Sequence, residues 1–179
     1  GKTTVARLMG KMLYSMGALP TPNVVEVGKA DLVGRHVGDT EAITSHVIDS
    51  AMGGILFIDE AYQLATEQFG GYGRVALETL VARLENDRDR FVCIAAGYTR
   101  EMQAFLAGNS GFESRFPRRN RIVFEDYTPE ELYRIFRIHS DKEGYVLDPM
   151  AENAVRGKLT MMYNNRGPSF GNGRDARNL

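Results

Sequence analysis

Apolar residues along the first two thirds of the chain follow two alternating patterns, one typical of strands and one of helices. Short apolar runs predict strands at residues 23–27, 54–58, 91–97 and 121–124. Apolar positions three or four residues apart predict helices at residues 3–17, 39–52 and 77–84, with one more short helix before residue 121. Strands that alternate with helices predict an α/β fold in which a parallel sheet lies between two layers of helices.

The pattern changes after the last of these strands and becomes purely helical. Thr128, Pro129 and Glu131 are typical of a helix start, because Thr caps the first turn, Pro is pre-set for it and Glu completes a capping box. Two further helices are predicted, one from residue 148 and one around residue 174. We therefore expect two parts, an α/β core over residues 1–126 and a small all-helical subdomain over residues 127–179.

The chain begins with a fragment of a phosphate-binding pattern. Gly1, Lys2 and Thr3 match the end of G-x-x-x-x-G-K-S/T, in which backbone N–H groups cradle phosphate, Lys reaches the outer phosphates and the hydroxyl ligates magnesium. The first glycine and its strand would lie before residue 1, so we expect the chain to be truncated within this motif. Alone, three matching residues fit a capped, solvated helix start equally well.

Two adjacent acids, Asp59 and Glu60, follow the apolar run at residues 54–58. Adjacent carboxylates are tolerated only where a buried strand emerges at the sheet's carboxyl edge, and ligands of open α/β sheets collect there. Solvated acids at a strand end are the alternative interpretation. Together with the opening GKT, the pair favours a nucleotide site with ATP and Mg²⁺ as cofactors, to which we assign Gly1, Lys2, Thr3, Thr4, Asp59 and Glu60.

Each of these residues has a predicted task in phosphoryl transfer. Lys2 places a positive charge against the β- and γ-phosphates, and the Thr3 hydroxyl holds Mg²⁺. Asp59 holds Mg²⁺ through its hydration shell, and Glu60 polarises the attacking water.

Composition narrows the class of protein further. The chain has 179 residues, 43% of them hydrophobic, and a net charge of −1, which gives little attraction to nucleic acid or anionic membrane. No apolar stretch reaches the ~20 residues needed to cross a bilayer, so we expect no membrane insertion. The single cysteine, Cys93, lies in an apolar segment as a predicted core residue and cannot form an internal disulfide. Reducing cytoplasm is the expected location.

Several motifs occur in one order along the whole chain: GKTTVARL, DLVGRHVGDT, GGILFIDEAYQL, FVCIAAGYT, GFESRFP, FEDYTPEEL and FGNGRDARN. With this order the chain resembles the AAA+ ATPases of the CbxX/CfxQ group, which have a P-loop NTPase core and a helical lid. That group includes activators that remodel inhibited red-type rubisco, ATPases of actinobacterial type VII secretion and sporulation-associated proteins. The sequence does not single out one of them.

The resemblance assigns roles to four arginines. Arg115 corresponds to the finger that enters the neighbouring subunit's site, and Arg118 to a frequent second arginine, which implies a homo-oligomeric ring, usually a hexamer. The alternatives are a surface pair of Arg115 with Glu113 and a merely solvated basic run. Arg174 corresponds to the second sensor of the lid, with Arg177 as fallback, unless both form salt bridges at a helix start.

The resemblance also predicts a loop that lines a central pore. It consists of Arg35, His36 and Val37, where His36 replaces the expected aromatic residue, and the flanking glycines would supply flexibility. Alternatively His36 is simply an exposed loop residue. Residues 67–72 are a second candidate, which a surface turn explains equally well.

The position of the first sensor departs from the family pattern. Many AAA+ proteins carry Asn there, whereas Tyr98 and Thr99 occupy it in this chain, and either hydroxyl could orient water. The predicted function is an ATP-hydrolysing machine that remodels a protein client, with no nucleic-acid partner. A nucleic-acid motor would require a basic face or a winged helix. A nucleotide-gated scaffold with little hydrolysis is the other alternative, because the sensor and the pore aromatic both depart from pattern.

Overall fold

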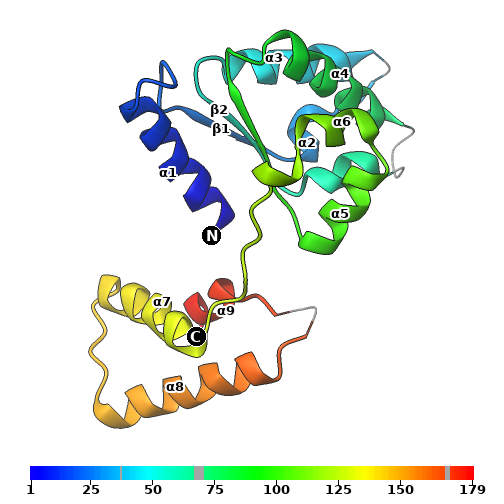
Figure 1. The fold of residues 1–179 in the computed structure, drawn as a ribbon. Coiled ribbons are helices and arrows are strands. Elements are labelled where there is room, and N and C mark those ends of the chain that lie inside the picture. Colours follow the sequence, from blue (N-terminus) through cyan, green and yellow to red (C-terminus); the bar gives the residue numbers. More distant parts are fainter. Residues whose placement is uncertain (37, 67–70, 168–169) are drawn as a thin grey trace. The chain divides into compact units, whose positions relative to one another are not determined.

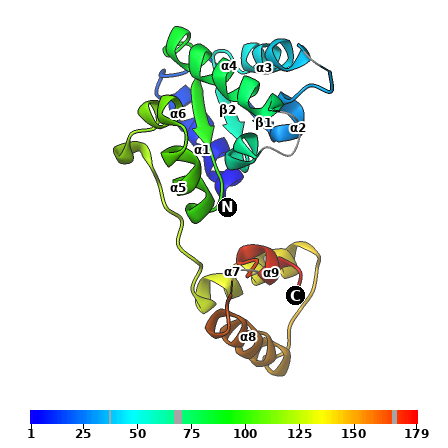
Figure 2. The ribbon, with the colours of Figure 1, turned by 90° about the vertical axis from the view of Figure 1, so that its right-hand side faces the viewer.

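The chain folds as two units, Gly1–Val123 and Phe124–Leu179. The computed structural model describes residues 1–36, 38–66, 71–167 and 170–179. Within these residues the first unit combines helices with a sheet, and the second is built from helices (Figures 1 and 2). The predicted fold class, α/β with a helical part after it, is therefore confirmed.

The sheet of the first unit has three parallel strands in the order β1-β2-β3. They are β1 (Val24–Val27), β2 (Ile55–Ile58) and β3 (Val92–Ala95). Ile58, the last residue of β2, is in register with Val27 and with Ala95. All four residues of β2 are buried, as expected for the central strand of a covered parallel sheet. The first three predicted strands are confirmed.

Alternate residues of the strands face opposite layers of helices. Leu56 and Ile58 join the larger core, to which helices α3 (Asp39–Ser50), α4 (Tyr72–Asn86) and α5 (Thr99–Ala107) contribute. Phe57 faces the other way and packs in a smaller cluster with Ala6 of α1 (Lys2–Ser15). Figure 1 shows α1 on one side of the sheet with α3 and α4 on the other, so the three-layer prediction is confirmed.

Helix α1 contacts the sheet through small residues. Gly10 is buried, and a Cβ there would lie 3.0 Å from both the Pro22 oxygen and Val24 Cγ2. This close approach turns the long side chains outwards, and Met12 and Met16 are 61% and 73% exposed. Their place on the apolar stripe of the helix predicted at residues 3–17 favours a core position, and this prediction is wrong. Cys93, in contrast, packs against the larger core as predicted.

The strand predicted at residues 121–124 is absent. After α6 (Ser110–Arg115) and the 3-10 turn η2 (Arg118–Asn120), residues 121–128 are neither helix nor strand. Ile122 and Val123 are 67% and 66% exposed. An apolar run becomes a strand only where a neighbour supplies hydrogen bonds, and no described strand pairs with this segment. The sequence also gave no signal for two other short elements, α2 (Lys29–Leu32) and η1 (Ala61–Ala65).

The second unit contains α7 (Pro129–Lys142), α8 (Pro149–Asn164) and α9 (Gly173–Arg177). The predicted capping box of α7 is confirmed. The Thr128 N–H donates to Glu131 Oε2 at 2.8 Å, and the Glu131 N–H donates to Thr128 Oγ1 at 3.3 Å. None of the helices in the described segments combines the length and apolar character needed to cross a lipid bilayer.

The core of this unit brings all three helices together. Leu132 and Tyr133 of α7 pack with Leu159 of α8 and Ala176 of α9. Asn172, just before α9, has a positive φ of 55°. Its side-chain oxygen accepts a hydrogen bond from the Tyr127 N–H at 3.1 Å, and its amide donates to Asp126 at 2.8 Å.

Candidate functional site

The acidic pair lies where the central strand ends. The Asp59 N–H donates to the Val27 oxygen at 2.8 Å and so adds a rung to the β1–β2 ladder. The Asp59 side chain is exposed and that of Glu60 is half-buried. Both carboxylates therefore leave the sheet at its carboxyl edge, where ligands of parallel α/β sheets collect.

Glu60 has a left-handed backbone, with φ of 50° and ψ of 45°. For a residue with a Cβ this costs roughly 1–2 kcal/mol. Three hydrogen bonds hold the turn: Glu60 N–H to Asp59 Oδ1 at 3.1 Å, Ala61 N–H to the Ala96 oxygen at 3.0 Å, and Gln63 N–H to the Glu60 oxygen at 2.9 Å. In addition, the Gln63 side-chain amide donates to Glu60 Oε2.

Helix α1 begins at the same edge of the sheet (Figure 1). Its first turn has no acidic residue, and within the described residues no side chain caps it. The first N–H groups of a helix lack partners inside the helix and carry the positive end of its dipole, which together attract anions. Lys2 and Thr3 are half-exposed in this turn, whereas Gly1 and Thr4 are exposed.

An aromatic pair connects the start of α1 with the segment after β2. The Lys2 ammonium lies 5.6 Å from the centroid of the Tyr98 ring, and the rings of Tyr98 and Tyr62 are 6.5 Å apart. Tyr98 immediately precedes α5, just after β3, and Tyr62 belongs to η1, three residues after Asp59. The structure thus brings Lys2 and the acidic segment to one edge. Burial, followed by the negative charge of Glu60, raises the pKa of Tyr62.

The side chains at this edge have the chemistry that a magnesium–nucleotide requires. Lys2 supplies a compact positive charge for phosphate oxygens, and the first turn of α1 supplies N–H donors. The Thr3 hydroxyl and the exposed Asp59 carboxylate are oxygen ligands of the kind that Mg²⁺ prefers. ATP and Mg²⁺ therefore fit the residues present.

Arg115 is held within its own unit. Its Nη1 donates to the Gly111 oxygen at 2.8 Å, and its Nη2 lies 3.4 Å from Glu85 Oε2. The Arg115 Nε is buried, and no group in the described part of the chain accepts its hydrogen bond. Glu113 pairs with Arg121 at 3.1 Å. The alternative of a surface pair between Arg115 and Glu113 is therefore wrong.

The other three candidate arginines reach the surface. Arg118 in η2 and Arg174 in α9 are exposed, and no side-chain partner of either is found among the described residues. Arg177 is also exposed, and its Nε donates to the Gly173 oxygen at 3.2 Å. Within the ranges described, neither Arg174 nor Arg177 forms the salt bridge considered as their alternative role.

Of the predicted pore loop, the structure describes Arg35 and His36, both exposed, whereas Val37 lies outside the described residues. Gly38 has φ of 92°, which favours glycine. Gly34, however, is buried, donates its N–H to Thr40 Oγ1 at 3.0 Å and leaves no room for a Cβ. Gly34 serves close packing rather than the flexibility expected of it.

Of the second candidate loop, residues 67–70 lie outside the described residues. Its last two residues, Gly71 and Tyr72, begin α4.

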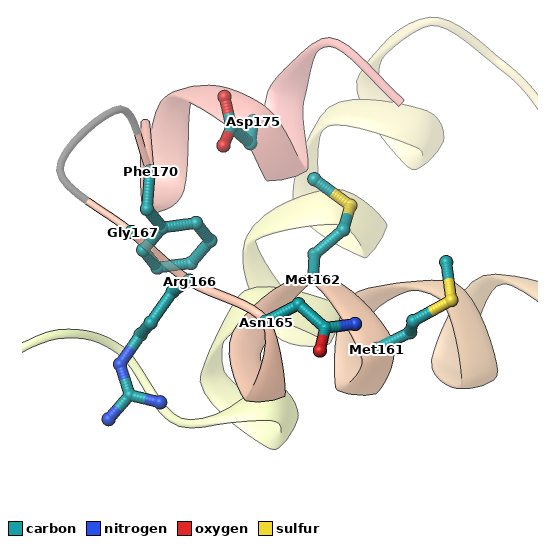
Figure 3. Close-up of a pocket in the computed structure, with 7 residues that line it drawn as sticks. All are labelled: Met161, Met162, Asn165, Arg166, Gly167, Phe170 and Asp175. Carbon is teal, nitrogen blue, oxygen red and sulfur yellow. The ribbon is translucent and has the colours of Figure 1, made fainter.

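The second unit contains a cavity of about 290 Å³ (Figure 3). Its lining consists of Met161, Met162, Asn165, Arg166, Gly167, Phe170 and Asp175. The charged groups of this lining are paired within the chain: Arg166 with Asp126 at 3.2 Å, and Asp175 with the Gly171 N–H at 2.8 Å. The pocket is thus a gap between α8 and the segment leading to α9, with both apolar and polar side chains in its lining.

Gln63 and Tyr62 are site residues that the sequence reasoning missed. A 3-10 turn places residues i and i+3 side by side. The three-residue spacing between Glu60 and Gln63 therefore predicts their contact only when the 3-10 turn is known to be there.

Comparison with known proteins covers nearly the whole chain. The family model of the ATPase family associated with various cellular activities (AAA) matches residues 1–122, and that of the AAA lid domain matches residues 128–179.

Three relatives illustrate the similarity. The chain is 43% identical over 180 residues to the ESX-3 secretion system protein EccA3 of Mycolicibacterium smegmatis, covering 100% of this chain and 29% of that protein. It is 42% identical over 180 residues to Stage V sporulation protein K of Bacillus subtilis, covering 100% and 55%. It is 41% identical over 179 residues to Protein CbbX of Cereibacter sphaeroides, covering 99% and 57%. The chain thus spans less than two thirds of the length of each. With an AAA core, an AAA lid and these relatives, the chain belongs to the AAA family of ATPases and, within it, to the CbxX/CfxQ type that its motifs resemble.

Proposed function

We propose that the complete protein binds ATP with Mg²⁺ at the carboxyl edge of the sheet and hydrolyses it. One observation carries this proposal: Lys2, in the first turn of α1, lies over Tyr98, next to the segment that contains Asp59 and Glu60. A phosphate-binding helix start and an acidic strand end are thereby adjacent. This adjacency is what phosphoryl transfer needs, because its catalysis is mostly positioning and charge neutralisation.

Each group then has one task. The Lys2 ammonium neutralises the β- and γ-phosphates, and the backbone at Gly1 and Thr4 lines the phosphate site. Thr3 and Asp59 would hold Mg²⁺. The ion would supply charge neutralisation for the transferring group.

Glu60 acts as the base that polarises the attacking water. Its carboxylate is half-buried, and its backbone is fixed by hydrogen bonds on both sides of the turn. Because the backbone of Glu60 is already fixed, this base loses little orientational freedom in the transition state. Such preorganisation lowers the activation free energy of the reaction.

The remaining groups act through assembly and the lid. Arg115 and Arg118 serve the active site of a neighbouring subunit in a homo-oligomeric ring, with six subunits as the expected number. The exposure of Arg118 supports such a role, since its guanidinium is available to another chain. Arg174 of the lid contacts nucleotide as second sensor, with Arg177 as the alternative. Tyr98 is the better candidate than Thr99 for the first sensor, because its ring contacts Lys2.

Hydrolysis would drive the remodelling of a protein client. Exposed Arg35 and His36 are the described residues of the loop that would contact this client. A relative named as a secretion system protein supports a protein rather than a nucleic acid as the client. A cytoplasmic location fits the use of ATP and the single cysteine.

The variant Glu60→Gln tests this proposal. In the complete protein we expect ATP affinity to stay unchanged and turnover to fall by about 10²–10⁴-fold, the usual loss of a catalytic base. Glu143→Gln, the same change at an exposed position after α7, is the matched control and should turn over normally. Turnover of Glu60→Gln at the parent rate would remove Glu60 from its role. A parent protein that binds ATP but does not hydrolyse it would indicate the nucleotide-gated scaffold instead.

A further inference from the structure

We propose that Gln63 is a positioning residue that orients the carboxylate of Glu60 towards the attacking water. This inference rests on the proposed function and adds to it a residue that acts through Glu60. The hydrogen bond from the Gln63 side-chain amide to Glu60 Oε2 motivates it. Among the described residues, Gln63 is the only side chain that donates to this carboxylate.

The local backbone explains why these two side chains meet. Glu60 precedes the 3-10 helix η1, and the Gln63 N–H donates to the Glu60 oxygen at 2.9 Å. In such a turn, residues three apart are stacked, so both side chains leave it on the same side. The left-handed conformation of Glu60 sets the direction in which this turn begins.

The turn itself is anchored to the sheet. Ala61 is fully buried, and its N–H donates to the Ala96 oxygen at 3.0 Å, while Ala96 donates to Ile58 at 2.8 Å. The strained backbone of Glu60 therefore persists because its surroundings fix it. The one freedom left to Glu60 is rotation of its side chain, and the Gln63 amide restricts that rotation.

The chemistry of the donor matters as much as its position. An amide is neutral, so it orients the carboxylate without neutralising it, whereas a lysine or arginine at position 63 would form an ion pair with the base. Gln63 occupies Oε2 and leaves Oε1 to accept the proton of the attacking water. Outer-shell partners that orient metal ligands are worth about 10–100-fold in activity, and we expect a loss at the lower end of this range for Gln63.

Gln63→Met tests the inference, because methionine keeps the length of the side chain and removes the donor. In the complete protein we expect kcat to fall about 10-fold, with unchanged KM, nucleotide affinity and melting temperature. Gln103→Met, the same change at an exposed position of α5, should leave kcat unchanged. A purely structural role would instead lower the melting temperature or raise KM. That result would overturn the inference, as would an unchanged or higher kcat.

A double-mutant cycle separates this inference from the proposal it rests on. If Gln63 acts through Glu60, the pair Glu60→Gln and Gln63→Met should turn over as slowly as Glu60→Gln alone. A further 10-fold loss in the double variant would overturn the positioning role while leaving Glu60 as the base. Parent-like turnover of the single variant Glu60→Gln would overturn the proposed function itself, so the two failures are distinguishable.

Discussion

The ammonium group of Lys2 lies over the ring of Tyr98, 5.6 Å from its centroid. Lys2 belongs to the first turn of α1, and Tyr98 follows β3, so the contact joins two segments almost a hundred residues apart in the chain. A free lysine side chain samples many rotamers, with about 2 kcal/mol of rotamer entropy. The contact with the Tyr98 ring restricts these rotamers and keeps the Lys2 ammonium near the edge of the sheet.

Removal of this ring is expected to weaken nucleotide binding. A cation–π contact at an exposed site is worth about 0.5–1 kcal/mol, so Tyr98→Leu should raise the Kd for ATP about two- to fivefold. Tyr98→Phe keeps the ring and should bind ATP as the parent does. Titration of both variants with a fluorescent nucleotide measures this. Equal weakening by Leu and Phe would mean that the hydroxyl, and not the ring, matters for binding.

The two candidate finger arginines should respond differently to substitution. Loss of an arginine finger costs about 10³–10⁵-fold in kcat, so we expect Arg115→Ala to lose most turnover while still binding ATP. It should also lower the melting temperature, because Arg115 contacts the Gly111 oxygen and Glu85. Arg118→Ala, at an exposed position, should slow turnover without changing the melting temperature.

A mixing experiment and a neighbouring residue provide the controls for the arginines. If the finger acts in a neighbouring subunit, mixtures of Glu60→Gln with Arg115→Ala should regain part of the turnover that each lacks alone. Arg119→Ala removes the adjacent exposed arginine and should turn over normally. The basic run is merely solvated if Arg118→Ala and Arg119→Ala both behave like the parent.

Much of the fold follows from local patterns in the sequence. The apolar run at residues 55–58 is a buried central strand, and the stripes at three- and four-residue spacing are helices. Thr128 and Glu131 form the predicted capping box because that motif depends only on residues within one turn. The position of Asp59 at the carboxyl edge of the sheet could be predicted because burying an unpaired carboxylate costs free energy.

The features that sequence reasoning missed depend on contacts between distant residues. Met12 and Met16 are exposed because Gly10 brings α1 against Pro22 and Val24, and no local pattern shows which face of a helix will come that close. Val123 belongs to an apolar run that has no strand partner in the described chain. The contact of Gln63 with Glu60 depends on a backbone conformation that glutamate rarely adopts.

Asp87 should make stability depend on pH at the acidic end. It is 8% exposed at the end of α4 and accepts hydrogen bonds from Arg83 at 2.5 Å and Arg90 at 2.8 Å. The hydrogen bond from Arg83, more than the one from Arg90, holds the pKa of Asp87 below its usual value. Because the folded-state pKa is lowered, the stabilisation is present above the unfolded pKa of about 3.9 and is lost as pH falls through the folded value.

The variant Asp87→Asn measures this contribution. We expect it to unfold at lower urea concentration than the parent at neutral pH, with a difference that shrinks below about pH 4. Asp89→Asn changes a side chain that is 93% exposed and should match the parent throughout. A difference that stays constant with pH would show that the Asp87 charge is not its cause.

Two glycines in helices should respond in opposite directions to alanine. Gly73 in α4 is buried, and a Cβ there would lie 2.1 Å from the Leu64 oxygen, so α4 contacts η1 backbone to backbone. Gly73→Ala must push these elements apart, at a cost of about 1–3 kcal/mol in the free energy of unfolding. Gly157 in α8 has no atom within 4 Å of a Cβ, and Gly157→Ala should stabilise its helix by roughly 0.5–1 kcal/mol.

The two glycine variants should also differ in their rates of ATP turnover. Because η1 carries Gln63 and follows Glu60, displacement of α4 by Gly73→Ala should also reduce kcat, measured at a temperature where the variant is still folded. Gly157→Ala changes only an exposed helix surface in the second unit and should keep kcat at the parent value. If Gly73→Ala is destabilised but turns over normally, the position of η1 is not set by its contact with α4, and the hydrogen bonds of the turn, including that from Ala61 to Ala96, hold Glu60 in place.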